Sequence, residues 1–133
     1  MQIEKAVIYT DGIAYPNPGR AGIGALIKDE RGKTIVTISE AIGYGTNNRA
    51  EYSAVIAALE KALSLGIKRV ELRSDSELVI NQINGRYRVK NAGLKPLHRK
   101  VLELRSRLEG FSATHIPRER NREADKLAGK SLK

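Results

Sequence analysis

Two acidic residues follow short predicted strands, where a carboxylate could take part in chemistry. Asp11 follows residues 6–9, and a carboxylate at the end of such a strand lies at a sheet edge, where active sites of α/β proteins are common. The simpler interpretation is a turn residue, because Asp-Gly is frequent in turns. Asp75 follows residues 69–73 and equally suits the N-cap of the next predicted helix.

Two further acidic residues, Glu51 and Asp125, fall inside predicted helices. Glu51 shares the apolar face of its helix with Ala54, Val55, Ala58, Ala62 and Leu65. A lone carboxylate buried on that face costs several kcal/mol unless it is paired or binds a metal. A capping arrangement with Asn48 explains the position of Glu51 equally well. Asp125 lies mid-helix, where aspartate has no intrinsic preference.

These four carboxylates form one cluster if the strands before Asp11 and Asp75 are neighbours. Carboxylates in one pocket repel each other and raise each other's pKa. The hard cations Mg²⁺ and Mn²⁺ relieve that repulsion through oxygen ligands. Two such ions about 4 Å apart suit phosphodiester hydrolysis, in which one activates water and the other stabilises the leaving oxygen. The chain has no cysteine and two histidines, which argues against zinc-thiolate or histidine-rich sites.

The elements that must position these residues follow the order βββαβααβα. Strands are predicted over 6–9, 22–28, 33–42, 69–73 and 112–116, and helices over 48–65, 75 to about 84, 94–108 and 121 to about 130. Short turns join the first three strands into an antiparallel meander, and alternation with helices implies parallel pairing of the later strands. We therefore expect an α/β fold, a five-stranded mixed sheet flanked by helices, in a single domain spanning 1–133.

Composition narrows the class of partner. The 133 residues carry a net charge of +9, which favours a polyanion such as nucleic acid, although a charged solvated surface is the simpler alternative. The N-terminus lacks a signal-peptide core, and no apolar run approaches the roughly 20 residues that span a bilayer. These features predict a cytoplasmic protein with no membrane partner. No protein partner is indicated, and a monomer is expected.

Four stretches of the sequence together resemble type 1 ribonuclease H. They are Tyr9-Thr10-Asp11-Gly12, Thr46-Asn47-Asn48-Arg49-Ala50-Glu51, Ser74-Asp75-Ser76 and Asn121-Arg122-Glu123-Ala124-Asp125-Lys126-Leu127-Ala128. The resemblance covers essentially the whole chain, and the Thr-Asn-Asn-Arg-x-Glu block is specific. It implies the ribonuclease H fold, with strand order 3-2-1-4-5 and strand 2 antiparallel. It also implies catalytic metal ligands at Asp11, Glu51, Asp75 and Asp125.

The resemblance further implies an endoribonuclease that hydrolyses the RNA strand of RNA–DNA hybrids with two Mg²⁺ ions, Mn²⁺ being an alternative. The products would carry 5′-phosphate and 3′-hydroxyl ends. The residues that match contacts to RNA 2′-hydroxyls are Gly12, Asn17, Asn47, Asn48 and Glu77. Those that match a pocket for a DNA-strand phosphate are Thr46 and Asn91. Helix capping remains an alternative for Thr46, Asn47 and Asn48, and a plain loop role for Asn91.

The chain departs from the family pattern at three places. Glu77 replaces a common glutamine, so it can accept from a 2′-hydroxyl but cannot donate. The basic, tryptophan-bearing insert of many members is missing before Val89-Lys90-Asn91, which predicts weaker and more salt-sensitive hybrid binding. Two interpretations, a substitute basic surface or a solvated helix face, stay open for Arg86, Arg88, Lys90, Lys95, Arg99 and Lys100.

The third departure concerns the loop histidine that many members carry after the last strand. His115 is predicted to lie inside the strand that Pro117 ends, in a structural role. Arg118 would then occupy the shortened loop, where it could contact a phosphate.

Two competing functions remain open at this point. One is a catalytically silent nucleic-acid-binding module, and the other is a different nuclease on the same fold, such as a resolvase or integrase. Four intact carboxylates argue against the binding module, because negative charge clustered against a polyanion weakens binding. The Thr-Asn-Asn-Arg-x-Glu block argues against the second nuclease.

Overall fold

A computed structural model describes residues 3–133 and places five strands in one mixed sheet of order β3-β2-β1-β4-β5. The elements are β1 (Lys5–Tyr15), β2 (Gly19–Lys28), β3 (Thr34–Gly45), α1 (Asn47–Ser64), β4 (Arg69–Ser74), α2 (Glu77–Ile83), α3 (Lys95–Ser106), β5 (Gly110–His115), a 3₁₀ turn (Arg118–Arg120) and α4 (Arg122–Lys130). Strands β1 to β3 pair antiparallel, whereas β4 pairs parallel with both β1 and β5. The predicted element order, sheet and strand order are confirmed.

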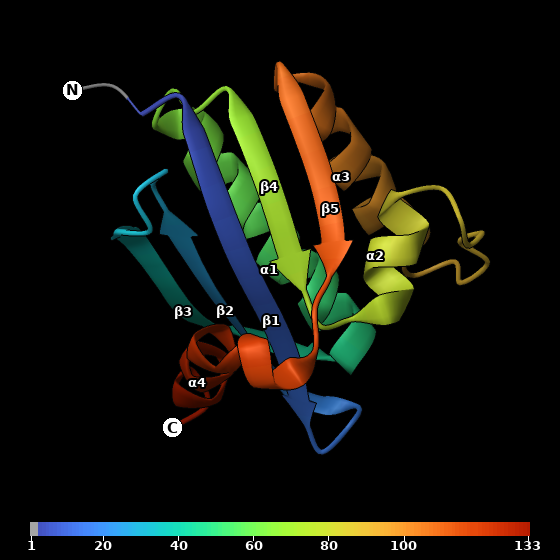
Figure 1. Ribbon diagram of the computed structural model, residues 1–133. Helices are drawn as coiled ribbons and strands as arrows, with labels where there is room; N and C mark the ends of the chain where they lie inside the picture. The colour runs from blue at the N-terminus through green and yellow to red at the C-terminus, as the bar shows by residue number, and fades with distance from the viewer. Residues whose placement is uncertain (1–2) are drawn as a thin grey trace.

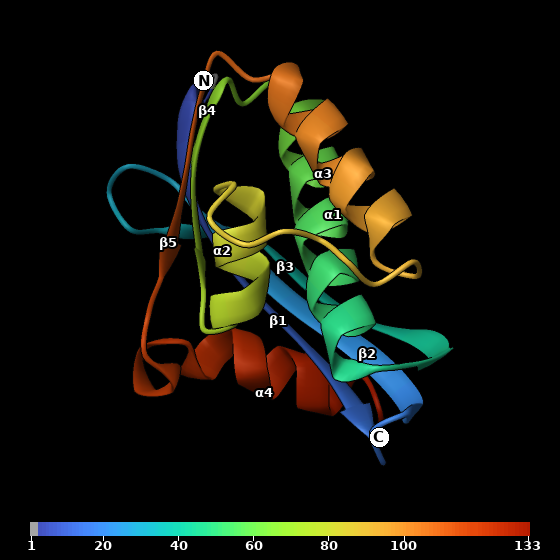
Figure 2. The same ribbon diagram turned by 90° about the vertical axis from the view of Figure 1, so that its right-hand side faces the viewer.

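Helices cover both faces of the sheet. In Figure 1, α1, α2 and α3 lie behind the sheet and α4 lies in front of it, and Figure 2 shows the same layers from the side. Two glycines permit this close packing: a Cβ on Gly12 would collide with the α1 backbone at Ala50, and one on Gly24 with the α4 backbone at Ala124. The sheet segment around β1 and β2 is therefore held tightly between α1 and α4.

The buried face of helix α1 forms the part of the core next to the site. Its buried residues are Ala50, Tyr52, Ala54, Val55, Ala58, Leu59 and Ala62. This stripe is rich in alanine, so the helix can approach the sheet closely. The side chain of Thr46 accepts a hydrogen bond from the Arg49 amide at 3.2 Å and caps the helix, and Gly66 follows its end with φ of 80°. Both helix boundaries agree with the sequence-based expectation to within about one residue.

The first strand is longer than predicted. Residues 10–12 were expected to end it, but β1 pairs with β2 as far as Tyr15↔Arg20. Asp11 therefore lies within a strand, opposite Gly24 of β2, and the prediction that it ends the strand is wrong. The local turn signal of Asp-Gly is overridden because β2 supplies backbone partners along the whole of this segment.

A buried polar network joins α1 to the segment that follows α2. The hydroxyl of Tyr52 donates to Oε1 of Gln82 at 2.6 Å, and the amide of Gln82 donates to the Arg88 carbonyl at 3.4 Å. A ring nitrogen of His98 on α3 lies 3.0 Å from the Gln82 carbonyl. Burial raises the pKa of Tyr52 to about 12, so this group stays a neutral donor. The network thus anchors the basic segment around Arg88 to the helix that carries Glu51.

We expect Tyr52→Phe to lower the free energy of unfolding by about 1–3 kcal/mol, because it leaves the buried Oε1 of Gln82 without a donor. Urea denaturation followed by circular dichroism would measure the change. Tyr44→Phe is the matched control, since Tyr44 is 77% exposed and should show no change. Equal stability of the two variants would contradict the inferred role of the network.

Candidate active site

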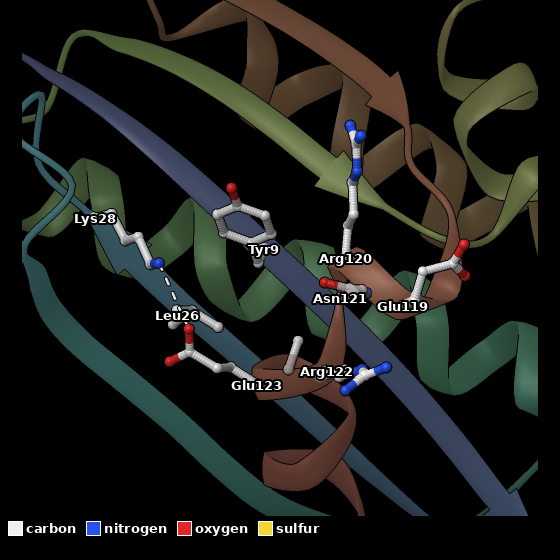
Figure 3. Close-up of a pocket in the computed structure, with 9 residues that line it drawn as sticks. Tyr9, Leu26, Lys28, Glu119, Arg120, Asn121, Arg122 and Glu123 are labelled. Atoms are coloured by element: carbon white, nitrogen blue, oxygen red, sulfur yellow. Dashed lines mark ion pairs between the residues drawn. The ribbon is translucent and has the colours of Figure 1, made fainter.

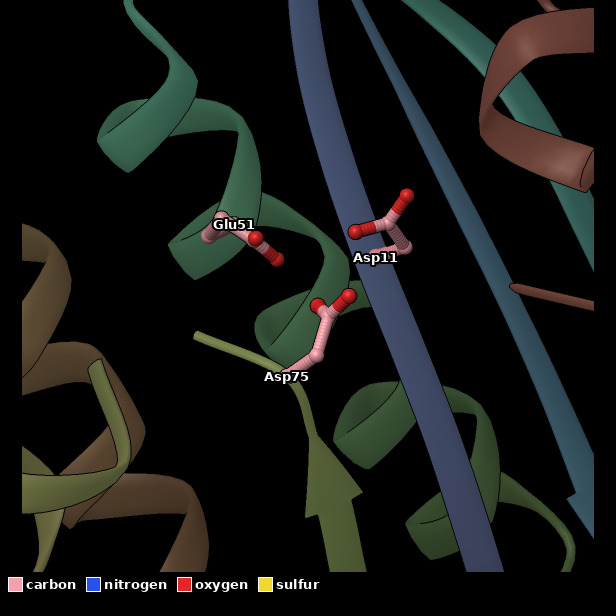
Figure 4. Close-up of side chains that lie close together, drawn as sticks. All are labelled: Asp11, Glu51 and Asp75. Atoms are coloured by element: carbon pink, nitrogen blue, oxygen red, sulfur yellow. The ribbon is translucent and has the colours of Figure 1, made fainter. Parts of the chain in front are cut away.

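Three carboxylates meet where β4 ends beside β1. Carboxylate oxygens of Asp11, Glu51 and Asp75 all lie within 4.8 Å of one another. Figure 4 shows the three side chains converging from β1, α1 and the end of β4. The ladder between β1 and β4 stops at the pair Thr10↔Ser74, so β1 continues beyond it with an open edge. Carboxylates from the strand, the covering helix and the following loop reach one another at that edge.

The structure excludes the simpler interpretations of Glu51 and Asp75. Oε1 of Glu51 accepts from the backbone N–H of Gly12 at 3.0 Å, while Thr46 caps α1, so Glu51 belongs to no capping box with Asn48. Helix α2 is capped by Ser76, whose hydroxyl accepts from the Val79 amide at 3.3 Å. Asp75 is therefore not a helix cap. Its carboxylate faces the other two instead.

The electrostatics of this cluster favour protonated carboxyls or a bound cation. The pKa of Asp11 is raised to about 8, first by burial and then by the negative charges of Asp75 and Asp125, while the charge of Arg118 lowers it. The pKa of Glu51 is raised well above its ordinary value, chiefly by burial and then by Asp11 and Asp75, although the Gly12 N–H opposes the rise. The folded protein thus holds negative charge here only at a cost.

Asp125, the fourth predicted ligand, lies beside the cluster rather than within it. It lies in the first turn of α4, so the prediction that it is mid-helix is wrong, because the helix begins at Arg122. Its charge contributes to the raised pKa of Asp11. One of its oxygens is 3.9 Å from Nη2 of Arg118. With Arg118, Glu119, Arg122 and Lys126 it lines a hollow of about 440 Å³.

The donor set fits a hard divalent cation. Every candidate ligand atom is a carboxylate oxygen, as such ions prefer. Within residues 3–133, Oδ2 of Asp11 is buried without a hydrogen-bond partner. A buried carboxylate oxygen left alone is costly, and a cation would satisfy it.

Comparison with known proteins agrees with this geometry. Residues 9–131 match the family model described as reverse transcriptase-like. Ribonuclease HI of Halobacterium salinarum is 39% identical over 124 residues, which make up 93% of this chain and 62% of that protein. The chain belongs to the type 1 ribonuclease H family. It spans less than two thirds of that curated relative and 35% of a bifunctional relative from Mycobacterium tuberculosis.

Solved ribonuclease H structures share the whole fold. The N-terminal ribonuclease H domain of the Mycobacterium tuberculosis protein superposes with a TM-score of 0.94 at 37% identity, covering 97% of this chain and 99% of that one. LC11-RNase H1, solved in complex with an RNA/DNA hybrid, superposes with a TM-score of 0.89 at 43% identity, covering 96% and 99%. Family and carboxylate cluster together support divalent metal binding by this chain.

The predicted substrate residues of the ribonuclease H site fall into two groups. The first surrounds the start of α1, where Oδ1 of Asn17 accepts from the Asn47 amide at 3.0 Å and Oδ1 of Asn47 accepts from the Ala14 amide at 2.7 Å. Asn48 is exposed in the first turn of α1, and Gly12 donates to Glu51. Asn17 and Asn47 thus use their side-chain oxygens to join the β1–β2 turn to α1.

The second group lies around α2 and the loop before α3. Glu77 is the first residue of α2, is exposed, and accepts from the Tyr87 hydroxyl at 3.2 Å. Oδ1 of Asn91 accepts from the amides of Gly93 at 2.8 Å and Leu94 at 3.1 Å, which orders that loop. A loop-ordering role for Asn91 is therefore present in the structure.

His115 and Arg118 were the two residues considered in connection with the family's loop histidine. His115 lies within β5, as predicted, and is its last residue, but its side chain is exposed, which does not support a structural role for it in the core. Arg118 lies in the 3₁₀ turn beside Asp125. Of the two, Arg118 is the group whose charge acts on Asp11.

Sequence-based reasoning assigned no function to Asn121. Asn121 was placed only within a family motif and at the start of the last predicted helix, with no role of its own. In the structure it is 1% exposed, and its amide donates to the Thr10 carbonyl at 2.8 Å. Burial beside β1 is the signal that separates it from an ordinary cap, and the local sequence does not contain it.

The raised pKa values predict that metal-free protein loses stability as pH rises. The unfolded chain releases the Asp11 proton near pH 4, whereas the folded protein keeps it until about pH 8. The folded state therefore binds more protons throughout this range, so the free energy of unfolding should fall between about pH 4 and about pH 8. A divalent cation should remove this loss, and its stabilising effect should grow with pH.

Melting temperatures at about pH 5 and about pH 8, each with chelator or with Mn²⁺, measure this expectation. Asp11→Asn is the control, because it removes the carboxyl with the raised pKa and should flatten the pH dependence. A chelated wild-type protein that is more stable at the higher pH would contradict the assignment.

Proposed function

We propose that this chain is an endoribonuclease that hydrolyses the RNA strand of RNA–DNA hybrids and leaves 5′-phosphate and 3′-hydroxyl ends. The observation that carries the proposal is the convergence of three carboxylates at the open edge of β1, with a buried Asp11 oxygen lacking a partner within residues 3–133. Support for the substrate comes from a relative of the same fold that was solved with an RNA/DNA hybrid. We infer that residues 1–133 act as one domain and as a monomer.

Two Mg²⁺ ions, or Mn²⁺ in their place, would be held by Asp11, Glu51, Asp75 and Asp125. Bound there, the ions would supply an activated water and stabilisation of the leaving 3′-oxygen. The chain's own residues hold the carboxyl groups close to one another, as metal binding requires. Gly12 orients Glu51 through its N–H, and Arg118 moderates the negative charge near Asp11.

Recognition of the RNA strand would fall to the start of α1. Asn17 and Asn47 use their side-chain oxygens within the protein, so their NH₂ groups are the donors for a 2′-hydroxyl. Asn48 and Glu77 are both exposed, and they lie close in sequence to Glu51 and Asp75, respectively. Glu77 would act as an acceptor. Discrimination of RNA from DNA would follow from these contacts.

The DNA strand would be held by a phosphate contact at Thr46 and Asn91 and by the basic surface near α3. Arg88, Lys95 and Arg99 line a cavity of about 370 Å³ that Tyr87 and His98 also border. This surface stands where the family's basic insert is missing, which supports its role as a substitute. Because exposed lysine and arginine contacts to phosphate are salt-dependent, binding should weaken steeply as salt increases.

One incubation series tests the proposal. Labelled RNA–DNA hybrid, double-stranded RNA and double-stranded DNA are each incubated with the protein and Mg²⁺, Mn²⁺ or chelator. We expect cleavage of the hybrid's RNA strand with metal only, and 5′-phosphate on the products. Hybrid binding without cleavage under either metal would instead identify a binding module, and indifference to the 2′-hydroxyl would identify another nuclease.

Among residues 3–133, none of the helices has the length and apolar character needed to cross a bilayer. Independently of this, the net charge of +9 suits nucleic acid as the partner.

A further inference from the structure

Asn121 connects the two elements that carry Asp11 and Asp125. Its side-chain amide donates to the carbonyl of Thr10, the residue before Asp11 in β1, at 2.8 Å. Its own carbonyl accepts from the Asp125 amide at 3.1 Å, in the first turn of α4. Figure 3 shows Asn121 at the start of α4, lying against β1 between Arg120 and Arg122. A single residue thus reaches the backbone beside one predicted metal ligand and the backbone of another.

The side chain of Asn121 is not used in the ordinary way for its position. Asparagine at a helix N-cap normally accepts a hydrogen bond from an amide in the first turn of the helix. Asn121 occupies the N-cap of α4, yet its side chain makes no capping bond within the described residues. Because the Thr10 carbonyl can only accept, the NH₂ group must face β1. The helix therefore lacks its cap, and the strand gains a fixed contact.

Attachment of α4 to the sheet does not depend on Asn121 alone. The Ser39 hydroxyl donates to the Leu127 carbonyl at 2.6 Å, and Nη2 of Arg20 donates to the Leu132 carbonyl at 2.9 Å. Both contacts lie beyond Asp125 toward the C-terminal end of the helix. The Asn121 contact fixes the position of the first turn of α4, and hence of Asp125, relative to Asp11.

We propose that Asn121 is a positioning residue that sets the distance between Asp125 and Asp11 and so completes the metal site. The inference rests on the proposed function, because it concerns ligands of the same site. Asn121 itself is 1% exposed and does not need to touch substrate or metal. Its Oδ1 is buried without a partner in the part of the chain described, so its one side-chain bond is the one to β1.

The test compares Asn121→Ala and Asn121→Ser with Ser39→Ala. Alanine removes the contact, and serine keeps a hydroxyl able to cap α4 but is too short to reach Thr10. Ser39→Ala removes a different bond between α4 and the sheet, so it reports a merely structural loss. Three quantities are measured for each: the Mn²⁺ dissociation constant by calorimetry, amide exchange of Asp125 in metal-free protein by NMR, and kcat and KM for hybrid.

Both Asn121 variants should bind Mn²⁺ about tenfold or more weakly, as is typical when a group that orients metal ligands is lost. The Asp125 amide should exchange several-fold faster, and kcat should fall while KM for the hybrid stays unchanged. Ser39→Ala should match the wild type in all three. Serine should recover stability relative to alanine without recovering Mn²⁺ affinity.

The inference would be overturned if both Asn121 variants kept the wild-type Mn²⁺ affinity and the wild-type exchange rate of the Asp125 amide. Equal losses in Ser39→Ala would also overturn it. If Asn121→Ala does not fold, Asn121→Ser decides, and failure of both to fold would make the contact a folding determinant and overturn a positioning role. If the wild-type protein binds Mn²⁺ but cleaves no hybrid, the proposed function is refuted and the inference about Asn121 is not. Mn²⁺ affinity and exchange of the Asp125 amide still test that inference.

Discussion

Asp11→Asn is expected to lower kcat/KM for hybrid cleavage by about a thousandfold or more. The substitution removes a buried carboxylate of the cluster, whose pKa both Asp75 and Asp125 raise. Metal stabilisation of the reaction contributes several kcal/mol, and about 4 kcal/mol corresponds to roughly a thousandfold in rate. The same change should stabilise the metal-free protein at about pH 8, since it removes a buried charge that its neighbours repel.

Steady-state cleavage of labelled hybrid and thermal melts in chelator would measure the two effects. Glu60→Gln is the matched control, because Glu60 lies exposed on α1 and should leave both rate and stability unchanged. The opposite signs of the two effects are the important feature, because an unfolded variant would lose both activity and stability. A kcat/KM for hybrid cleavage within tenfold of the wild-type value would show that Asp11 is not part of the site.

Gly12→Ala is expected to destabilise the protein by about 3 kcal/mol or more and to impair cleavage as well. A Cβ at this position would overlap backbone atoms of Ala50 and Glu51, which cannot rotate away as a side chain can. Overpacking of this kind typically costs about 1–3 kcal/mol and sometimes more. Helix α1 would have to move off β1 and would carry Glu51 away from Asp11 and Asp75.

Gly129→Ala provides the control for this second variant. Gly129 lies in α4, where a Cβ would have no atom of residues 3–133 within 4 Å apart from its chain neighbours and its own helix backbone. Alanine at this position should therefore stabilise the helix by up to about 1 kcal/mol. Denaturant unfolding of both variants, followed by the hybrid assay, measures the difference. If Gly12→Ala proved as stable as wild type, the close contact between β1 and α1 would be disproved.

Local sequence signals were sufficient for α1. An alanine- and leucine-rich run without proline or glycine predicts a helix at any place in a fold, and Thr46 and Gly66 are residues that begin and end one. The same local reasoning failed at Thr10-Asp11-Gly12. It favoured a turn there, but pairing with β2 up to Tyr15↔Arg20 continues the strand. Strand pairing joins segments that are distant in sequence, so a local pattern cannot reveal where it stops.

The sequence by itself determined the family motifs, the order of the elements and the four carboxylates as candidates, because each depends on residue types at short spacing. The tertiary structure decided which of them meet. Asp11, Glu51 and Asp75 converge because the pairing of β4 with β1 ends one residue short of Asp11, whereas Asp125 stands beside them on α4. The role of Asn121 was likewise decided in three dimensions, because only the packing of α4 on β1 shows that its side chain turns from the helix to the strand.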